Sequence, residues 1–219
     1  MEKKSSVNKT VAQIQDKALT FGSRCILLLR LLLGALSIPL IIGVTIGFSK
    51  SISLLEKDSL RFFIAGIVAY LILHHFIYKP VAVYKFGQGV LQFLFSFFAP
   101  LVKIASYLLP IYALLIIVLF FILTRAFNAA VDPDIFLLLI AFSFSFHLIL
   151  TADSLRDKES GLGRANYFFG FSLIYLLNIV MLAAGLHFIF SKFSFLGFLS
   201  QSGRESWQIY QNVFRQLFV

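Results

Sequence analysis

The sequence predicts an all-α integral membrane protein, a helical bundle with five to six transmembrane segments and amphipathic helices at both termini. Hydrophobic residues make up 59% of the 219 residues and charged residues only 13%. The mean hydropathy is +0.91, whereas soluble domains are only about half apolar. The apolar residues also gather in runs close to the ~20 residues that a helix needs to cross a bilayer. The apolar surplus is therefore expected to face lipid.

Charge and cysteine content narrow the classes of partner. The net charge is +9, but the basic residues flank the apolar runs and form no continuous stripe. This pattern favours the lipid bilayer, with its anionic headgroups, as the partner and argues against nucleic acid. The single cysteine, Cys25, excludes an intrachain disulfide.

Composition divides the chain into three regions. Residues 1–24 are basic and carry apolar residues three and four positions apart, which predicts an amphipathic helix on the membrane surface; a solvated tail is the alternative. Residues 25–190 form the transmembrane domain. Residues 191–219 form a less apolar, amphipathic tail. No separate soluble domain and no internal repeat is expected.

Five apolar runs of the central region are expected to cross the membrane. They are residues 25–48, 62–78, 107–124, 135–151 and 166–190. Asp132 and Pro133 predict a helix start before the fourth run, because an acidic cap and a proline suit the first turn. The run 86–99 is shorter; it either dips into the membrane and returns or spans together with residues 101–109.

The C-terminal tail has the pattern of an amphipathic helix. Its apolar face carries Trp207, Tyr210, Val213, Phe214, Leu217 and Phe218, opposite Gln208, Gln211, Asn212 and Arg215. This pattern predicts a helix at the membrane interface or one that binds a partner. A C-terminal helix that docks on the same protein is the alternative.

The distribution of basic residues predicts the orientation. With an N-terminus inside, the inner side holds 11 Lys and Arg and the outer side 7, whether or not the run 86–99 is counted as a span. Inner loops carry the excess of basic residues. The N-terminus is therefore expected in the cytoplasm, while the side of the C-terminus stays undecided.

The stretch Tyr84-Lys-Phe-Gly-Gln88-Gly89-Val-Leu-Gln92 has the frame of the F-G-H-E-x-x-H zinc helix. Further segments follow in order: Phe98-Ala-Pro100, Tyr107-Leu-Leu-Pro110-Ile-Tyr112, Phe146-His-Leu-Ile-Leu-Thr151 and Ile174-Tyr-Leu-Leu-Asn178. Together they resemble a bacterial branch of the integral-membrane zinc metallopeptidases related to site-2 proteases. The resemblance covers about half of the chain. It implies a peptidase-like helical architecture in a bacterial inner (cytoplasmic) membrane.

The residues that perform the chemistry of this family are absent from the motif. The family motif binds Zn²⁺ through two histidines at i and i+4, and its glutamate is the general base for the metal-bound water. Gln88, Gly89 and Gln92 occupy these three positions. An amide is a poor zinc ligand, and glycine cannot accept a proton. The resemblance therefore implies a pseudoenzyme without a metal or other cofactor. If the alignment is wrong, the two glutamines are a polar pair that bonds a neighbouring helix.

The histidines offer a different candidate site, because ionisable groups inside membrane spans are often functional. The possible intramembrane polar cluster consists of His74, His75, His147 and Asn178. Facing imidazoles would suit a b-type haem. Alternatively, His74 and His75 lie at the interface, and His147 bonds Asn178 or a serine such as Ser143 or Ser145.

The leading functional hypothesis is a catalytically inactive, metallopeptidase-like binding or scaffold subunit for other membrane proteins. Its groove is expected to retain a helix without cutting it. A haem-carrying redox subunit and a small-solute transporter are the alternatives. The sequence does not identify the partner protein.

Overall fold

The computed structural model describes residues 2–55, 58–77, 80–97, 105, 107–156 and 164–218; for residues 2–21, 23–24, 27, 77 and 164–166 it describes only the backbone. The main elements are α1 (Glu2–Ser53), α2 (Ser59–Ile72), the π-helix η1 (Leu73–Ile77), α3 (Val81–Leu94), α5 (Ile111–Phe121), the π-helix η2 (Ile122–Ala126), α6 (Pro133–Arg156), α7 (Arg164–Ile189) and α8 (Phe195–Phe218). Within the described ranges there is no β-strand. The predicted all-α class is confirmed.

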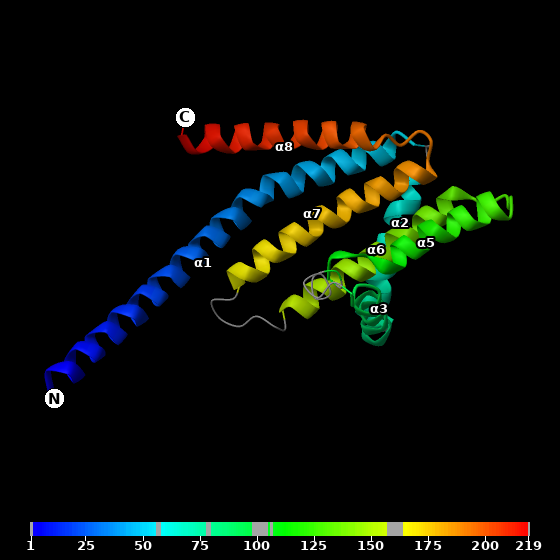
Figure 1. The fold of residues 1–219 in the computed structure, drawn as a ribbon. Helices are drawn as coiled ribbons and strands as arrows, with labels where there is room; N and C mark the ends of the chain where they lie inside the picture. Colours follow the sequence, from blue (N-terminus) through cyan, green and yellow to red (C-terminus); the bar gives the residue numbers. More distant parts are fainter. Residues whose placement is uncertain are drawn as a thin grey trace.

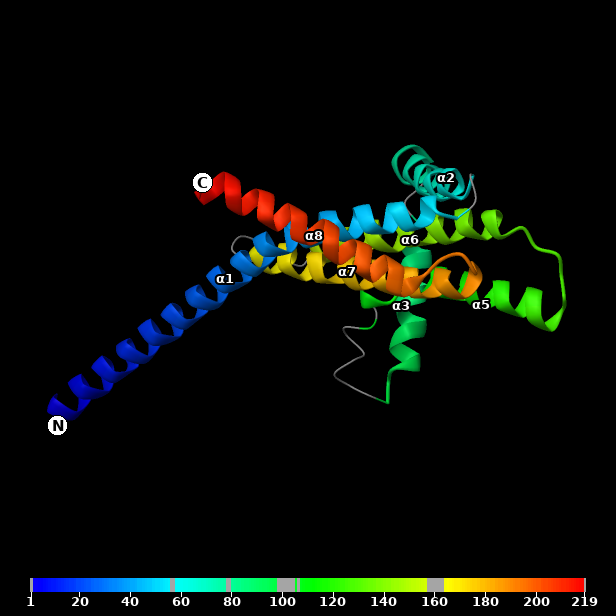
Figure 2. The same cartoon turned by 90° about the horizontal axis from the view of Figure 1, so that it is seen from above.

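The helices are arranged in two directions. In both views α5, α6, α7 and the second half of α1 run roughly alongside one another, whereas α3 crosses this group (Figures 1 and 2). The first half of α1 extends beyond the bundle, and α8 folds back along α1. This places α3 close to the beginning of α5 and the second half of α6, which is where the candidate site lies.

Four of these helices are long and apolar enough to cross a membrane. They are Leu28–Ser53, Ser59–Phe76, Pro133–Arg156 and Tyr167–Ile189. Many of their large apolar side chains are exposed, as expected for helices that face lipid. The helical membrane class is therefore supported.

The predicted count of five to six spans is not reached by the described helices. The apolar helix Ile111–Ala126 is shorter than the other four. The run 86–99 contributes to α3, which has 14 residues, about 21 Å at the rise of an α-helix and less than the ~30 Å of the hydrocarbon core. Residues 98–104, on which the spanning alternative depends, lie outside the described residues.

The central element of the core is α6. Leu137, Ile140 and Ala141 are completely buried, and α6 packs mainly against α2, α5 and α7. Gly66 lets α2 approach α6 closely, because a Cβ at this position would lie only 2.9 Å from the Cβ of Ala141. As predicted, α6 begins at Asp132-Pro133: the Asp132 Oδ1 accepts a hydrogen bond from the backbone N–H of Asp134 at 2.9 Å.

The basic N-terminal segment is continuous with the first span. The backbone is helical from Glu2 through Ser53 without interruption. Most side chains of residues 1–24 lie outside the described part. The helix expected there is present as backbone, and its amphipathic face and membrane-surface position remain predictions.

Small residues bring α8 onto α1. Gly43 and Gly47 face Ser206 and Ser202, so that a Cβ on Gly47 would lie only 2.8 Å from the Cα of Ser202. Both pairs are spaced four residues apart, the spacing with which helices approach closely in membranes. The C-terminal helix therefore docks on another helix of the same protein, as the alternative interpretation of the tail predicted.

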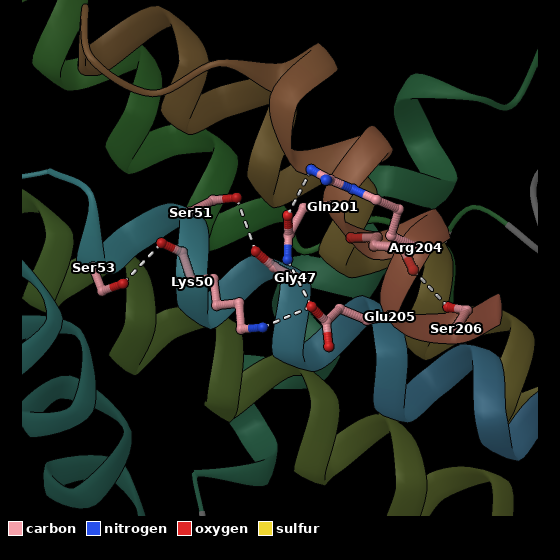
Figure 3. Close-up of polar contacts among 9 residues, drawn as sticks. Gly47, Lys50, Ser51, Ser53, Gln201, Arg204, Glu205 and Ser206 are labelled. Carbon is pink, nitrogen blue, oxygen red and sulfur yellow. Dashed lines mark hydrogen bonds and ion pairs between the residues drawn. The ribbon is translucent and has the colours of Figure 1, made fainter. Parts of the chain in front are cut away.

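Polar contacts complete the α1–α8 packing (Figure 3). The Lys50 Nζ lies 2.6 Å from the Glu205 Oε1, and this ion pair keeps the pKa of the Glu205 carboxyl below its usual range. The Tyr210 hydroxyl donates a hydrogen bond to the carbonyl of Leu36. Most of the apolar face predicted for the tail, including Trp207, remains exposed. The helix therefore docks through its small residues and presents its aromatic residues outward.

Candidate binding site

The stretch from Tyr84 to Gln92, which resembles the zinc-binding motif, lies on α3, and one side of this helix faces the protein interior. Tyr84 and Leu91 are buried there, and so is Gly87, where a Cβ would lie 2.8 Å from the Tyr112 ring. Gln88 is half-buried, whereas Gly89 and Gln92 are exposed. A Cβ added at Gly89 would meet no atom of the described residues within 4 Å. The three motif positions thus face different surroundings.

Tyr84 connects the motif helix to α6. Its hydroxyl lies 2.8 Å from the Thr151 Oγ1 and accepts a hydrogen bond of 3.0 Å from the Gln88 Nε2. Burial raises the pKa of Tyr84 to about 12, so the phenol stays neutral near pH 7. The hydroxyls of Tyr84 and Thr151 share one hydrogen bond, in which either can be the donor. The amide at position 88 therefore acts as a hydrogen-bond donor within a structural network.

We expect Tyr84→Phe to destabilise the protein by about 1–2 kcal/mol, because Thr151 is completely buried and would lose its tyrosine partner. Thr151→Val should cost less when combined with Tyr84→Phe than when introduced alone. A double-mutant cycle of unfolding in detergent measures this coupling. Gln92→Leu, at an exposed position of α3, is the control. Additive effects of the two substitutions would contradict the network.

An apolar groove opens beside α3. It has a volume of about 340 Å³ and is lined by Leu73, Pro80, Val83, Tyr112, Leu115, Ile116, Leu119, Phe142, Ser143 and Phe146. The Tyr112 hydroxyl is occupied by the Val83 carbonyl, to which it donates at 2.6 Å. Val83, Leu115 and Leu119 are exposed, so the groove is open to the surroundings of the bundle. Its chemistry suits an apolar segment.

A polar pocket adjoins the same helix. It also has a volume of about 340 Å³ and is lined in part by Lys85, Gln88, Asp153 and Arg156. An ion pair of 3.2 Å joins Arg156 to Asp153. Tyr84 contributes to this pocket and also contacts the ring of Phe146, which lines the apolar groove. The beginning of α3 therefore has an apolar surface and a charged surface close to each other.

His147 forms a hydrogen bond with the backbone of the segment before α5. The N–H of Ile111, the usual partner of the Tyr107 carbonyl in a helix, instead donates to the carbonyl of Leu109 at 2.9 Å. The His147 Nε2 lies 3.1 Å from the Tyr107 carbonyl oxygen. A carbonyl only accepts, so this nitrogen carries the proton. The expected bond from His147 to Asn178, Ser143 or Ser145 is wrong, because His147 bonds the Tyr107 carbonyl, whose usual helical partner is engaged elsewhere.

Asn178 has a similar role from α7. Its Nδ2 donates to the carbonyl of Leu108 at 2.9 Å and to that of Ile174 at 2.8 Å. Pro110, which has no N–H, follows shortly after Leu108 in the chain. Irregular backbone at membrane depth is tolerated where protein groups satisfy it. His147 and Asn178 are therefore brought together at adjacent carbonyls and act as donors to them.

The other histidines form hydrogen bonds separate from those of His147 and Asn178. The His74 Nδ1 is 3.2 Å from the Tyr70 hydroxyl, and the His187 Nδ1 is 2.7 Å from the Phe193 carbonyl. His75 is exposed. Among the described residues, no group of three or more His, Cys, Asp or Glu is placed to hold a metal ion. Ligation of haem by the His147 Nε2 would require its bond to Tyr107 to break.

Sequence reasoning did not identify the small residues between α1 and α8. Gly43 and Gly47 form a G-x-x-x-G pattern, and Ser202 and Ser206 form S-x-x-x-S. These patterns are visible in the sequence as packing signals. The Tyr84–Thr151 bond joins positions 67 residues apart and has no comparable local signal.

Comparisons of this chain with protein-family models, with curated proteins and with solved structures gave no match.

Proposed function

We propose that this chain is a catalytically inactive membrane protein that binds a transmembrane segment of another membrane protein. The observation that carries the proposal is the apolar groove of about 340 Å³ between η1, α3, α5 and α6. It lies beside a helix whose motif positions hold Gln88, Gly89 and Gln92 in place of ligands and a base. Such a protein would retain a helix as a scaffold subunit without cleaving it.

The composition of the groove supports a helix as its ligand. Leu115 and Leu119 are one turn apart on α5, and both are exposed at the groove. Helix association in lipid depends on van der Waals packing and on few polar contacts. Ser143 provides one hydroxyl for such a contact. A partner helix with small residues would pack most closely there.

The charge distribution supports an orientation with the N-terminus on the cytoplasmic side, and the resemblance to bacterial membrane metallopeptidases supports a bacterial inner membrane. Eleven Lys and Arg belong to the N-terminal side and seven to the other. A fifth crossing by Ile111–Ala126, together with residues before it, would place the beginning of α8 on the side opposite the N-terminus. That side would then carry the contact between Lys50 and Glu205.

Site-specific photo-crosslinking in native membranes tests the groove. A photoreactive residue at Leu115 should give a discrete protein adduct, which mass spectrometry identifies. Leu173, an exposed leucine on α7, is the matched control and should give lipid adducts. Leu119→Trp, which narrows the groove, should remove the protein adduct, whereas Val213→Trp on α8 should not. Identical adducts from Leu115 and Leu173 would contradict the proposal.

The absence of catalysis is tested separately on the purified protein. We expect neither stoichiometric zinc nor cleavage of membrane peptides. Bound zinc together with cleavage that Gln88→Ala abolishes would show an active enzyme. A Soret band would favour the haem alternative, and solute uptake in liposomes would favour transport.

A further inference from the structure

A third cavity lies where α1 ends and α8 begins. It has a volume of about 490 Å³. The side chains that define its chemistry are those of Lys50, Lys192, Arg204 and Ser194. None of the motifs or clusters discussed above includes this cavity. Its position is independent of the groove beside α3.

The lining of this cavity is strongly basic. Lys50, Lys192 and Arg204 contribute three positive charges, and no carboxylate lines it among the described residues. The nearby Glu205 is bonded to Lys50 at 2.6 Å and accepts a hydrogen bond of 2.6 Å from Gln201 (Figure 3). Arg204 donates to the neutral amide oxygen of Gln201 at 3.0 Å. The cavity wall therefore carries a net positive charge.

The hydroxyl groups of the cavity differ in what they offer a ligand. Ser51 donates its hydroxyl proton to the Gly47 carbonyl, and Ser53 donates to the Lys50 carbonyl (Figure 3). Ser194 instead accepts a hydrogen bond of 3.0 Å from the N–H of Gly197 in the first turn of α8. Its own proton is available to an acceptor in the cavity. An oxyanion in the cavity would supply that acceptor.

The cavity lies where two candidate membrane spans end. Lys50 is in the last turn of α1, which ends at Ser53, and Lys192 follows the end of α7 at Ile189. Because both helices are candidate spans, we expect their ends at the level of lipid headgroups. Arg and Lys are the residues that bind phosphate oxygens through charge-assisted hydrogen bonds.

We propose that the cavity between the end of α1 and the beginning of α8 binds a phosphate group through Lys50, Lys192, Arg204 and Ser194. The phosphate belongs either to an anionic phospholipid headgroup or to a soluble phosphate compound. A bound phosphate would contact α1, α8 and the connection between α7 and α8. It would therefore stabilise the docked position of α8.

Native mass spectrometry of the full chain in detergent tests the site with two probes, phosphatidylglycerol and inorganic phosphate; phosphatidylcholine is the zwitterionic reference. The pocket variant is Lys192→Gln with Arg204→Gln. The control, Arg125→Gln with Arg215→Gln, removes the same charge at exposed positions outside the cavity. The pocket variant should bind phosphatidylglycerol roughly 25-fold more weakly, since each basic residue near an anionic headgroup contributes about fivefold. The control should retain wild-type affinity.

The two probes separate the possible sources of the phosphate. Selective loss of phosphatidylglycerol binding assigns the site to a lipid headgroup. Loss of inorganic phosphate binding, with no preference for either lipid, assigns it to a soluble compound. Equal binding of both probes by the pocket variant and the control overturns the proposal. If the double variant does not fold, Arg204→Gln alone should still weaken binding about fivefold.

Discussion

Replacing Gly43 with leucine is expected to release α8 from α1. A Cβ at Gly43 would overlap the backbone of Ser206, and a backbone cannot rotate away as a flexible side chain does. Overpacking of a close contact typically destabilises by about 1–3 kcal/mol. Since this contact holds α8 by its small residues, we expect the helix to separate from α1 while the remaining bundle stays folded.

Hydrogen exchange of the α8 amides in detergent micelles measures the release. In the Gly43→Leu variant the amides of residues 198–210 should exchange faster, and trypsin should cleave faster at Arg204. The matched control is Gly203→Leu on α8 itself, where an added Cβ would meet no atom within 4 Å among the described residues. Unchanged exchange in Gly43→Leu, or equal effects of both substitutions, would contradict the packing of small residues.

The second large effect is expected for His147→Leu. This substitution removes the donor to the Tyr107 carbonyl from a side chain that is only 4% exposed. This bond is part-buried, and leaving a buried acceptor without its donor costs about 1–3 kcal/mol. Asn178→Leu, which removes the donor to the adjacent Leu108 carbonyl, should cost a similar amount. The two effects are expected to be non-additive because both side chains hold the same interrupted segment.

Unfolding by SDS titration, followed by circular dichroism, measures these effects. His75→Leu replaces an exposed histidine and should change stability by less than about 0.5 kcal/mol. His147→Gln retains an N–H donor and should recover part of the stability. If His147→Leu were as stable as His75→Leu while visible absorbance was lost, His147 would be a cofactor ligand rather than a donor to the backbone.

For the C-terminal tail, the sequence predicts the helix, and the structure shows which face of it docks. The 3.6-residue period of the tail predicts an amphipathic helix, which α8 confirms. The period alone does not say which face docks. The conspicuous aromatic face is mostly exposed, and the less conspicuous Ser202 and Ser206 make the contact. The two helices can approach closely because Gly43 and Gly47 on α1 have no side chains. These glycines lie about 160 positions away in the sequence.

The sequence by itself determined the class of the protein and the approximate position of its helices. Long apolar runs must satisfy their backbone internally in lipid, so they are helices, and local signals such as Asp132-Pro133 mark where one begins. Only the tertiary structure decided the partners of Tyr84, His147 and Asn178, and it also assembled the groove beside α3 and the basic cavity at Lys50. Contacts between residues far apart in the chain depend on how the helices cross. A local sequence period does not specify which helices cross or at which residues.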